Sequence, residues 1–430
     1  MSEENLSGKT FGVMDHYGLF VGIARRLAKS GARVIYSTPI DRRDSINEAI
    51  IGDGMPEIEC TDDLWPMKKQ IDCFVFPDIR HQGMQAELRS QGYPVWGSQG
   101  GMILEQNRQF FHAKLGELGL DVPKFTEVVG LDNLAAFLKD RKDIWLKVSK
   151  WRGSWETTHW RSWDEDWMLM DGWRVKFAGI KDHLKFLCFD KIETDLEIGA
   201  DTYCIDGVWP SQMLHGIERK NKAYFGAVTN YNDMPKQLTT VMEAISPMMK
   251  EFGYRNQWSM ENRVKGNENY FIDATCRGGL PSTASFLTAR NIGSVILGGA
   301  QGDMVEVDYG FKFSAECAVE IEDAADSWGM VKLAPEIKES LLAQQCCESN
   351  GLLWFPPTGV TSGHIGWLKT TGDTPTEAFQ KMNELADELP DGVDARVEAL
   401  ADVIKEIESE QDQGIWFTDL PIPEQQIVLE

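Results

Sequence analysis

The stretch from residue 258 to residue 282 constrains the fold most, because it predicts a β-hairpin with an acidic residue on each strand. Its turn, residues 265–269, is polar and contains glycine, as hairpin connections usually do. Glu261 lies on the first predicted strand and Asp273 on the second, where Thr275 shares the face of Asp273 because side chains alternate along a strand. Two carboxylates that point the same way from paired strands can hold a hard cation, and the alternative is a solvent-exposed sheet face.

The region before residue 100 predicts a small doubly wound α/β domain. A strand at 10–14, a helix at 20–30 and a strand at 32–36 form one β-α-β unit, which implies parallel strands. The first turn lacks GxGxxG, which argues against a bound dinucleotide. That turn, Asp15 to Gly18, is either a ligand-binding loop at a helix N-terminus or a structural turn. A second series of strand, helix and strand is expected at 73–76, 83–91 and 94–97.

The next region repeats helix and strand signals and contains one unusual lysine. A helix through Phe110 and Leu118 precedes an apolar strand at 144–148, which Lys147 interrupts. A lysine at such a position is costly unless its ammonium reaches solvent or meets an anion. A basic turn with one glycine follows at 149–155. Further strands are expected at 125–129, 184–189, 196–205, 314–321, 351–355 and 363–370, and further helices at 131–139, 235–253, 285–298, 373–389 and 396–410.

Length, charge and composition limit the number of domains and the kinds of partner that the chain can have. Its 430 residues suggest roughly three domains. The net charge of −24 argues against nonspecific binding to nucleic-acid backbones or membranes, and it still allows a local basic pocket for phosphates. The eight cysteines form no CxxC pair, and no apolar run reaches about 18 residues. We therefore expect a cytoplasmic protein with reduced thiols and no membrane span, and the sequence carries no strong signal for nucleic-acid binding.

In order and spacing, a series of segments resembles the ATP-grasp superfamily, and most closely the glycinamide ribonucleotide synthetases (phosphoribosylamine–glycine ligases). The resemblance covers nearly the whole chain, and its individual motifs are weak. The segments are CFVFPDIRHQGMQAELRSQGYPVWGSQGGMILEQNRQFF, LKVSKWRGSW, FDKIETDLEIGADTYCIDG, YFIDATCRGG and SGHIGWLKTTGDTPTEAFQKMNELADEL.

The resemblance implies a domain layout. Residues 1–105 would form a Rossmann-like pre-ATP-grasp domain, and residues 301–430 a small α+β domain with a helical tail. Between them, residues 106–300 would form the ATP-grasp fold from two α+β subdomains. The first, 106–183, would carry the phosphate loop, and the second, 184–300, the nucleotide and metal residues.

The resemblance also implies an ATP site. Lys147 and Arg108 would neutralise the ATP phosphates. Arg108 stands where the family has lysine, so a planar guanidinium group replaces a compact ammonium group at this position. Ser154 would contribute from the phosphate loop. Glu197 matches the acid that receives the ribose hydroxyls, although an exposed strand acid is the alternative. Three residues would hold adenine at the hinge: Asp190, Lys191 and Ile192.

The hairpin would supply the metal and catalytic groups. By the resemblance, Glu261 and Asp273 bind Mg²⁺, with Mn²⁺ as an alternative, and Thr275 stands where the family has asparagine. Arg277 would act as a catalytic residue with Lys147 by steadying the transferring phosphoryl group, and a surface ion pair is its alternative role.

The chain departs from the family where the acceptor would bind. The glycine-rich N-terminal motif is absent, and the phosphate loop carries Trp151, Arg152 and Trp155 in place of glycines. We therefore expect an ATP-dependent carboxylate–amine ligase that forms an amide through an acyl phosphate and acts on a different substrate pair. The partners would be a small carboxylate and a small amine, and the chain a monomer or homodimer. The alternatives are an ATP-grasp carboxylase and a noncatalytic nucleotide-binding homologue. Six tryptophans at 151–173 would form either an aromatic acceptor pocket or a packed subdomain core.

Overall fold

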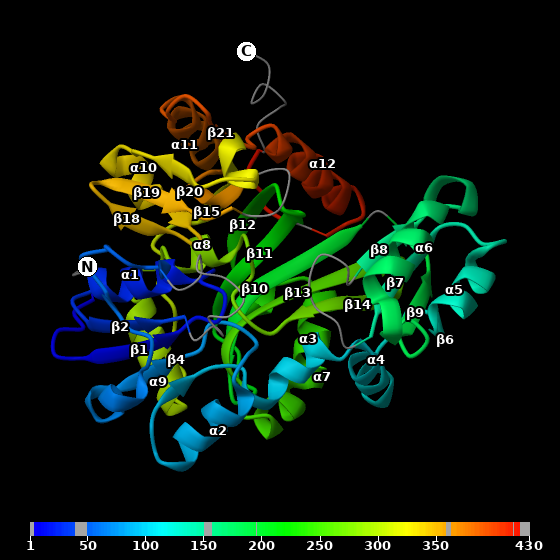
Figure 1. The fold of residues 1–430 in the computed structure, drawn as a ribbon, viewed down its shortest axis with the longest axis horizontal. Helices are drawn as coiled ribbons and strands as arrows, with labels where there is room; N and C mark the ends of the chain where they lie inside the picture. The colour runs from blue at the N-terminus through cyan, green and yellow to red at the C-terminus, as the bar shows by residue number, and fades with distance from the viewer. Residues whose placement is uncertain are drawn as a thin grey trace. The chain divides into compact units, whose positions relative to one another are not determined.

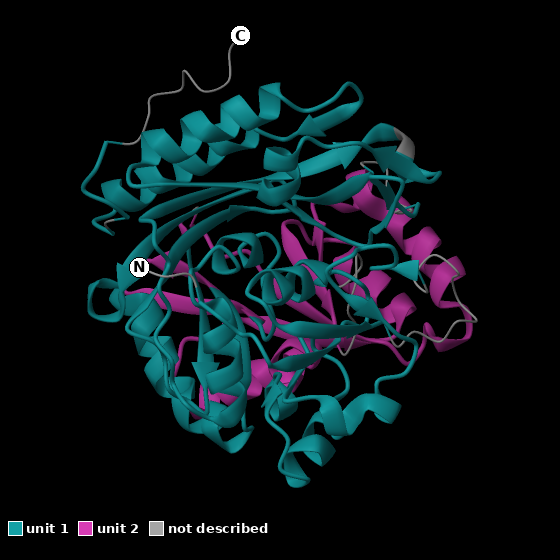
Figure 2. Ribbon diagram, turned by 90° about the vertical axis from the view of Figure 1, so that its left-hand side faces the viewer, with its two compact units in different colours: residues 1–101, 198–260, 275–430 teal, residues 102–197, 261–274 magenta. Residues whose placement is uncertain are grey.

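The computed structural model describes residues 4–38, 50–149, 157–194, 196–357, 363–415 and 417–421. The chain divides into two compact units, which Figure 2 draws in different colours. Unit 1 comprises residues 1–101, 198–260 and 275–430, and unit 2 comprises residues 102–197 and 261–274. Both parallel and antiparallel sheets are present, so the predicted mixed α/β class is confirmed. No helix among the described residues is long and apolar enough to cross a membrane.

The N-terminal part of unit 1 is a five-stranded parallel sheet with the order β3-β2-β1-β4-β5 (Figure 1). The parallel pairing of β1 with β2 is the one that the predicted β-α-β unit implies. Helix α1 buries Val21, Ile23, Ala24 and Leu27, the apolar stripe that its sequence predicts. The elements are β1 (Thr10–Met14), α1 (Val21–Lys29), β2 (Arg33–Ser37), β3 (Glu59–Cys60), β4 (Cys73–Val75), α2 (Gln82–Ser90) and β5 (Val95–Trp96).

The largest sheet has nine strands, and its order is β14-β13-β10-β11-β12-β15-β20-β17, with β21 paired to β15. The boundary between the units falls within β10, β13 and β14. The strands are β10 (Glu197–Ile205), β11 (Gln212–Arg219), β12 (Ala223–Asn230), β13 (Arg255–Lys265), β14 (Glu268–Thr275), β15 (Phe313–Ile321), β17 (Leu341–Ala343), β20 (His364–Gly372) and β21 (Val393–Ala395).

Helices from the C-terminal half of the chain pack on this sheet. Phe379 of α11 stacks on Phe225 of β12, with ring centroids 4.7 Å apart. The Thr374 hydroxyl caps α11 by accepting from the Glu377 amide at 3.2 Å, as the sequence predicts. A three-stranded sheet with the order β16-β19-β18 is also present. The elements are α7 (Lys236–Glu251), α8 (Thr283–Phe286), α9 (Ile292–Gln301), β16 (Gly329–Val331), α10 (Pro335–Ser340), β18 (Cys347–Ser349), β19 (Leu352–Phe355), α11 (Pro375–Asp387) and α12 (Ala399–Asp412).

The helix predicted over 285–298 is broken between α8 and α9. The Arg26 guanidinium donates hydrogen bonds to the carbonyls of Leu287 and Ala289, each at 3.0 Å, at the turn between them. At the start of α9, the Glu4 carboxylate accepts from the amides of Gly293 and Ser294 at 3.0 and 2.9 Å. These partners are distant in sequence, so the local pattern could not predict the break.

Unit 2 is built on a four-stranded antiparallel sheet with the order β6-β9-β7-β8. Trp160 and Trp173 are buried in its core, so the packed-core interpretation of the tryptophan-rich segment is confirmed for these two, whereas Trp167 is 46% exposed. Trp151 and Trp155 lie outside the described residues. The elements are α3 (Ile103–Gln106), α4 (Arg108–Glu117), β6 (Phe125–Val129), α5 (Leu131–Leu138), β7 (Ile144–Val148), β8 (Thr157–Trp160), α6 (Trp163–Phe177) and β9 (Lys185–Asp190).

Candidate active site

Arg108 and Asp273 form a partly buried ion pair in unit 2, although 165 residues separate them in sequence. The Arg108 Nη1 atom donates to the Asp273 Oδ1 atom at 2.8 Å, and the Arg108 side chain is only 3% exposed. The helix expected to run through this region is interrupted at Asn107, whose side chain accepts from the Phe110 amide at 3.1 Å. That cap makes Arg108 the first residue of α4.

Lys147 lies close to the same strand as Asp273. Its Nζ atom donates to the carbonyl of Ile272, the residue before Asp273, at 3.4 Å. It also lies 5.9 Å from the centroid of the Phe189 ring. Burial alternates along β7, and Lys147 falls on the less buried face. The ammonium of Lys147 is therefore not buried in the core of unit 2, and the energetic cost of burying a charge in this apolar strand does not arise.

His112 belongs to this cluster, and the sequence analysis missed it. Burial, followed by the positive charges of Lys147 and Arg108, lowers the pKa of His112 to about 3. Neither ring nitrogen has a hydrogen-bond partner within the part of the chain that the structure describes. Its imidazole is therefore neutral and lies 4.9 Å from the Phe189 ring. The spacing of four residues from Arg108 on one helix was the available sequence signal.

The predicted adenine hinge follows β9 on the surface of unit 2. The Asp190 amide donates to the Lys124 carbonyl at 3.2 Å, and the Asp190 side chain is 52% exposed. Glu197, predicted to meet the ribose, accepts from the Arg263 Nε atom at 2.9 Å. Its carboxylate therefore has a cationic partner within unit 2. Lys191 is exposed and Ile192 half-buried, and Ser154 of the predicted phosphate loop lies outside the described residues.

The three predicted metal-site residues lie on neighbouring strands, Glu261 on β13 and Asp273 and Thr275 on β14. All three side chains are half-buried. Among the described residues there is no group of three or more His, Cys, Asp or Glu that could hold a metal ion. Two carboxylates are nevertheless a sufficient protein share for Mg²⁺, which completes its shell with waters and phosphate oxygens, so the donor set fits.

Burial along β14 does not follow the alternation of its side chains. Its buried residues are Phe271 and Ala274, which are three positions apart and therefore on opposite faces of an extended strand. Each face of the strand therefore has a buried side chain, and the face that Asp273 and Thr275 share also carries the buried Phe271.

In unit 1, Arg277 lies at the carboxyl end of the parallel sheet. Its Nε atom is 3.6 Å from the Oδ1 atom of Asp78, which is buried beyond the end of β4, and its Nη1 atom donates to the Gly278 carbonyl at 3.1 Å. The Arg277 side chain is 21% exposed. The ion pair considered from the sequence is therefore present, but with a buried partner rather than a surface one.

The turn after β1 places further polar side chains at this edge. Asp15 accepts from the Phe20 amide at 2.6 Å and from the Tyr36 hydroxyl at 2.8 Å, which makes it a structural anchor of the turn. Burial raises the pKa of Asp15 to about 7. His16 Nδ1 lies 3.2 Å from His81 Nε2, a pairing that the sequence analysis also missed because it joins loops after different strands.

Comparisons with known proteins bear on the fold. No protein-family model and no curated protein matches the sequence. Among solved structures, phosphoribosylamine–glycine ligase from Thermotoga maritima has a TM-score of 0.66 at 16% identity, covering 90% of this chain and 98% of that one. The biotin carboxylase domain dimer of Hydrogenobacter thermophilus 2-oxoglutarate carboxylase, solved with MgADP, ADP and bicarbonate, has a TM-score of 0.62 at 13% identity, covering 95% and 96%.

A third similar structure is N5-carboxyaminoimidazole synthetase from Staphylococcus aureus in complex with ADP. It has a TM-score of 0.57 at 12% identity, and the match covers 90% of this chain and 99% of that one. These three proteins share one fold, and each match spans nearly the full length of both chains. The chain therefore has the ATP-grasp fold of these proteins, as the sequence resemblance implied.

Proposed function

We propose that this protein is an ATP-dependent ligase that joins a carboxylate to an amine and releases ADP and phosphate. The observation that carries the proposal is the grouping of Arg108, Lys147 and Asp273 in unit 2 of a chain with the ATP-grasp fold. A buried guanidinium, an ammonium and a half-exposed carboxylate are the groups that an ATP–Mg²⁺ complex needs in order to bind. The hinge, Asp190 to Ile192, and Glu197 complete the proposed nucleotide site.

In the proposed reaction, an oxygen of the substrate carboxylate attacks the γ-phosphorus of ATP. The bond to the β-phosphate oxygen breaks, and ADP leaves with that electron pair. The amine then attacks the acyl carbon, loses a proton and displaces phosphate, so that an amide forms. Lys147 and Arg108 would bind and orient the phosphates, and Arg277 would contact the transferring phosphoryl group.

Glu261 and Asp273, with Thr275 beside them on the strand, would hold the divalent cation. Mg²⁺, or Mn²⁺ in its place, supplies charge neutralisation at the phosphate oxygens when bound. Asp273 would be shared between the cation and Arg108, and the arginine would hold that carboxylate in place. His112 is neutral and would add no charge to the site, so the positive charge beside the phosphates would come from Lys147 and Arg108.

The proposed setting is a reducing one. All eight cysteines are free thiols, and six of them are buried. This supports a cytoplasmic enzyme, because disulfides are rare in that compartment. Its proposed substrates are a small carboxylate and a small amine, and its proposed state is a monomer or homodimer.

The test is ADP release from MgATP in the presence of pooled carboxylic acids and amines. We expect at least one pool to stimulate release by wild-type protein, and Asp273→Ala to abolish it. Asp132→Ala, which changes an exposed acid of the same unit, is the matched control and should retain activity. Release that depends on bicarbonate alone would favour the carboxylase alternative. Binding of MgATP without turnover under every pool would favour the noncatalytic alternative, and either result would contradict the proposal.

A further inference from the structure

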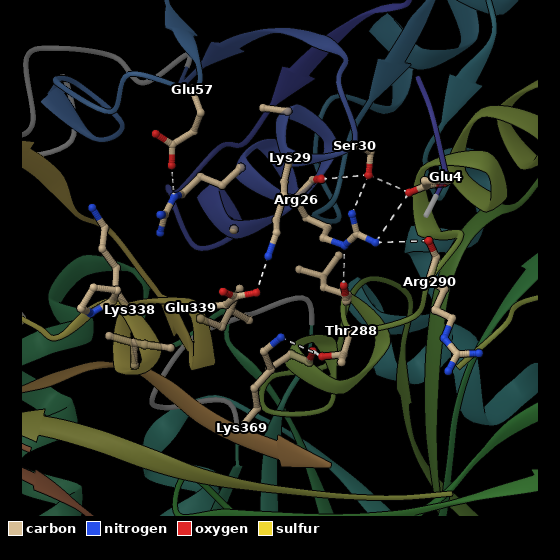
Figure 3. Close-up of a pocket in the computed structure, with 18 residues that line it drawn as sticks. Glu4, Arg26, Lys29, Ser30, Glu57, Thr288, Arg290, Lys338, Glu339 and Lys369 are labelled. Carbon is tan, nitrogen blue, oxygen red and sulfur yellow. Dashed lines mark hydrogen bonds and ion pairs between the residues drawn. The ribbon is translucent and has the colours of Figure 1, made fainter. Parts of the chain in front are cut away.

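A cavity of about 750 Å³ lies wholly within unit 1 and concentrates positive charge (Figure 3). It is bounded by α1, the turn between α8 and α9, α10, β17 and β20. Six cationic and three acidic side chains line it in a chain whose net charge is −24, and two further acids, Glu348 and Asp308, pair with Lys338 and Arg290 from outside the lining. The cations are Arg25, Arg26, Lys29, Arg290, Lys338 and Lys369, and the acids are Glu4, Glu57 and Glu339.

Several of these cations are held by partners at the margin of the cavity. Arg25 contacts Glu57 at 2.6 Å, and Lys338 contacts Glu348 at 2.7 Å. Lys29 contacts Glu339, and both of their side chains are more than half exposed. These groups contribute to the positive field, but each already has a carboxylate neighbour.

Lys369 differs from the other cations, and Figure 3 shows its side chain reaching toward Thr288. Its Nζ atom donates to the Thr288 hydroxyl at 2.8 Å, which is a neutral acceptor. Within the described residues, no carboxylate lies within ion-pair distance of this ammonium. An ammonium has three hydrogen-bond donors, so Lys369 can donate to a ligand in the cavity.

The acid opposite Lys369 in the sheet makes its hydrogen bonds elsewhere. Glu316 of β15 is directly opposite Lys369 in the antiparallel register. Its Oε1 atom instead accepts from the Ser285 amide at 2.9 Å and from the Ser285 hydroxyl. Burial raises the pKa of Glu316 and lowers the pKa of Lys369, and the attraction between the two groups opposes both shifts.

An apolar wall completes the cavity. It is formed by aliphatic side chains from α8 and the residue that follows it, from the start of α10 and from β17. A ligand that fits both parts has an anionic end and a compact organic body. The wall residues are Ala284, Leu287, Pro335, Leu341 and Leu342.

We propose that this cavity, the Lys369 pocket, binds a small phosphorylated molecule whose phosphate accepts a hydrogen bond from Lys369. A phosphate monoester carries close to two negative charges at neutral pH and has several acceptor oxygens, which suits a cavity lined by six cationic side chains better than one carboxylate does. The body of the molecule lies on the apolar wall. The proposal concerns unit 1 alone and stands independently of the proposed ligase reaction.

The test is isothermal titration calorimetry of the full-length protein at pH 7 without ATP, with phenyl phosphate as the probe. Inorganic phosphate lacks the organic body, and benzoate replaces the phosphate by a carboxylate. We expect phenyl phosphate to bind more tightly than either. Equal affinity for benzoate would overturn the assignment to phosphorylated ligands, and no measurable binding of phenyl phosphate would overturn the site itself.

Three variants locate the binding. Lys369→Gln should weaken it by roughly tenfold or more, because a charge-assisted hydrogen bond is lost. Glu339→Gln should tighten it several-fold, because an acid is removed and Lys29 is released, and a merely destabilised variant would not gain affinity. Lys332→Gln, at an exposed lysine outside the cavity, should change nothing. Unchanged binding by Lys369→Gln, or loss of binding in Lys147→Ala instead, would overturn the proposal.

Discussion

The Arg108 guanidinium donates to the Asp273 carboxylate at 2.8 Å, and this contact joins the start of a helix to a strand of the hairpin. Arg108 is 3% exposed, whereas Asp273 is 28% exposed. The carboxylate therefore compensates part of the buried charge of the arginine and keeps part of its own surface for other ligands.

We predict that Asp273→Ala lowers the free energy of unfolding of the protein by about 1–3 kcal/mol, because a buried guanidinium loses a charged acceptor. Urea denaturation without nucleotide or metal measures this. Asp132→Ala should stay within about 0.5 kcal/mol of wild type, because Asp132 is 63% exposed and lies among surface ion pairs. Equal stability of the two variants would show that the Arg108 contact contributes nothing.

Lys147→Ala should weaken ATP binding by roughly ten- to a hundredfold, because an ammonium that can reach the phosphates is removed. Lys142→Ala is the matched control, since Lys142 is exposed and lies just before β7, the strand that contains Lys147. Equilibrium dialysis with MgATP compares the two. If both variants bound ATP as wild type does, Lys147 would have no part in the nucleotide site.

Because His112 is buried in its neutral form, we predict that the free energy of unfolding falls at acid pH. Its pKa is lowered to about 3 by burial and by Lys147 and Arg108, with Asp273 opposing them. Between that value and the ordinary pKa of about 6.5, the unfolded chain binds a proton that the folded chain does not, so stability rises with pH across this window. His112→Phe, an aromatic replacement, should reduce this slope, as measured by thermal melting from pH 4 to pH 7. An unchanged slope would contradict a buried neutral imidazole.

Asp15 predicts the opposite slope over a similar range. Burial and the nearby Asp78 raise its pKa to about 7, against hydrogen bonds from Phe20 and Tyr36 that lower it. From about pH 4 to pH 7 the folded chain holds a proton that the unfolded chain releases, so this contribution to stability is lost as pH rises through 7. Asp15→Asn should remove that loss. Thermal melting between pH 4 and pH 7 measures this. If the melting temperature of the variant still fell toward pH 7 as that of wild type does, Asp15 would not be the cause of the loss.

Most of the helices and strands could be predicted from the sequence, because their formation depends on residues that are neighbours along the chain. The strands at Phe125–Val129 and Ile144–Val148 were predicted with their observed bounds, and α1 follows its apolar stripe. The turn Asp15 to Gly18 could be narrowed to two alternatives, and the buried Asp15 contacts favour the structural one.

The remaining features depend on contacts between distant segments. The break before α9 requires Arg26, and the Arg108–Asp273 pair joins residues 165 positions apart. His112 is ordinary in sequence, and only the fold reveals that it is buried beside two cations. The Lys369 pocket likewise draws its charges from helices and strands spread between residues 4 and 369, so no window of sequence contains it.

The most direct test of the proposed function follows oxygen from the carboxylate into phosphate. The carboxylic-acid pool that stimulates ADP release is labelled with ¹⁸O in its carboxyl groups, and the released phosphate is examined by mass spectrometry. An acyl-phosphate route predicts one ¹⁸O atom in each phosphate formed, with an amide as co-product. Phosphate without the label, formed at the same rate as ADP, would contradict attack by the substrate carboxylate on ATP and with it the proposed function.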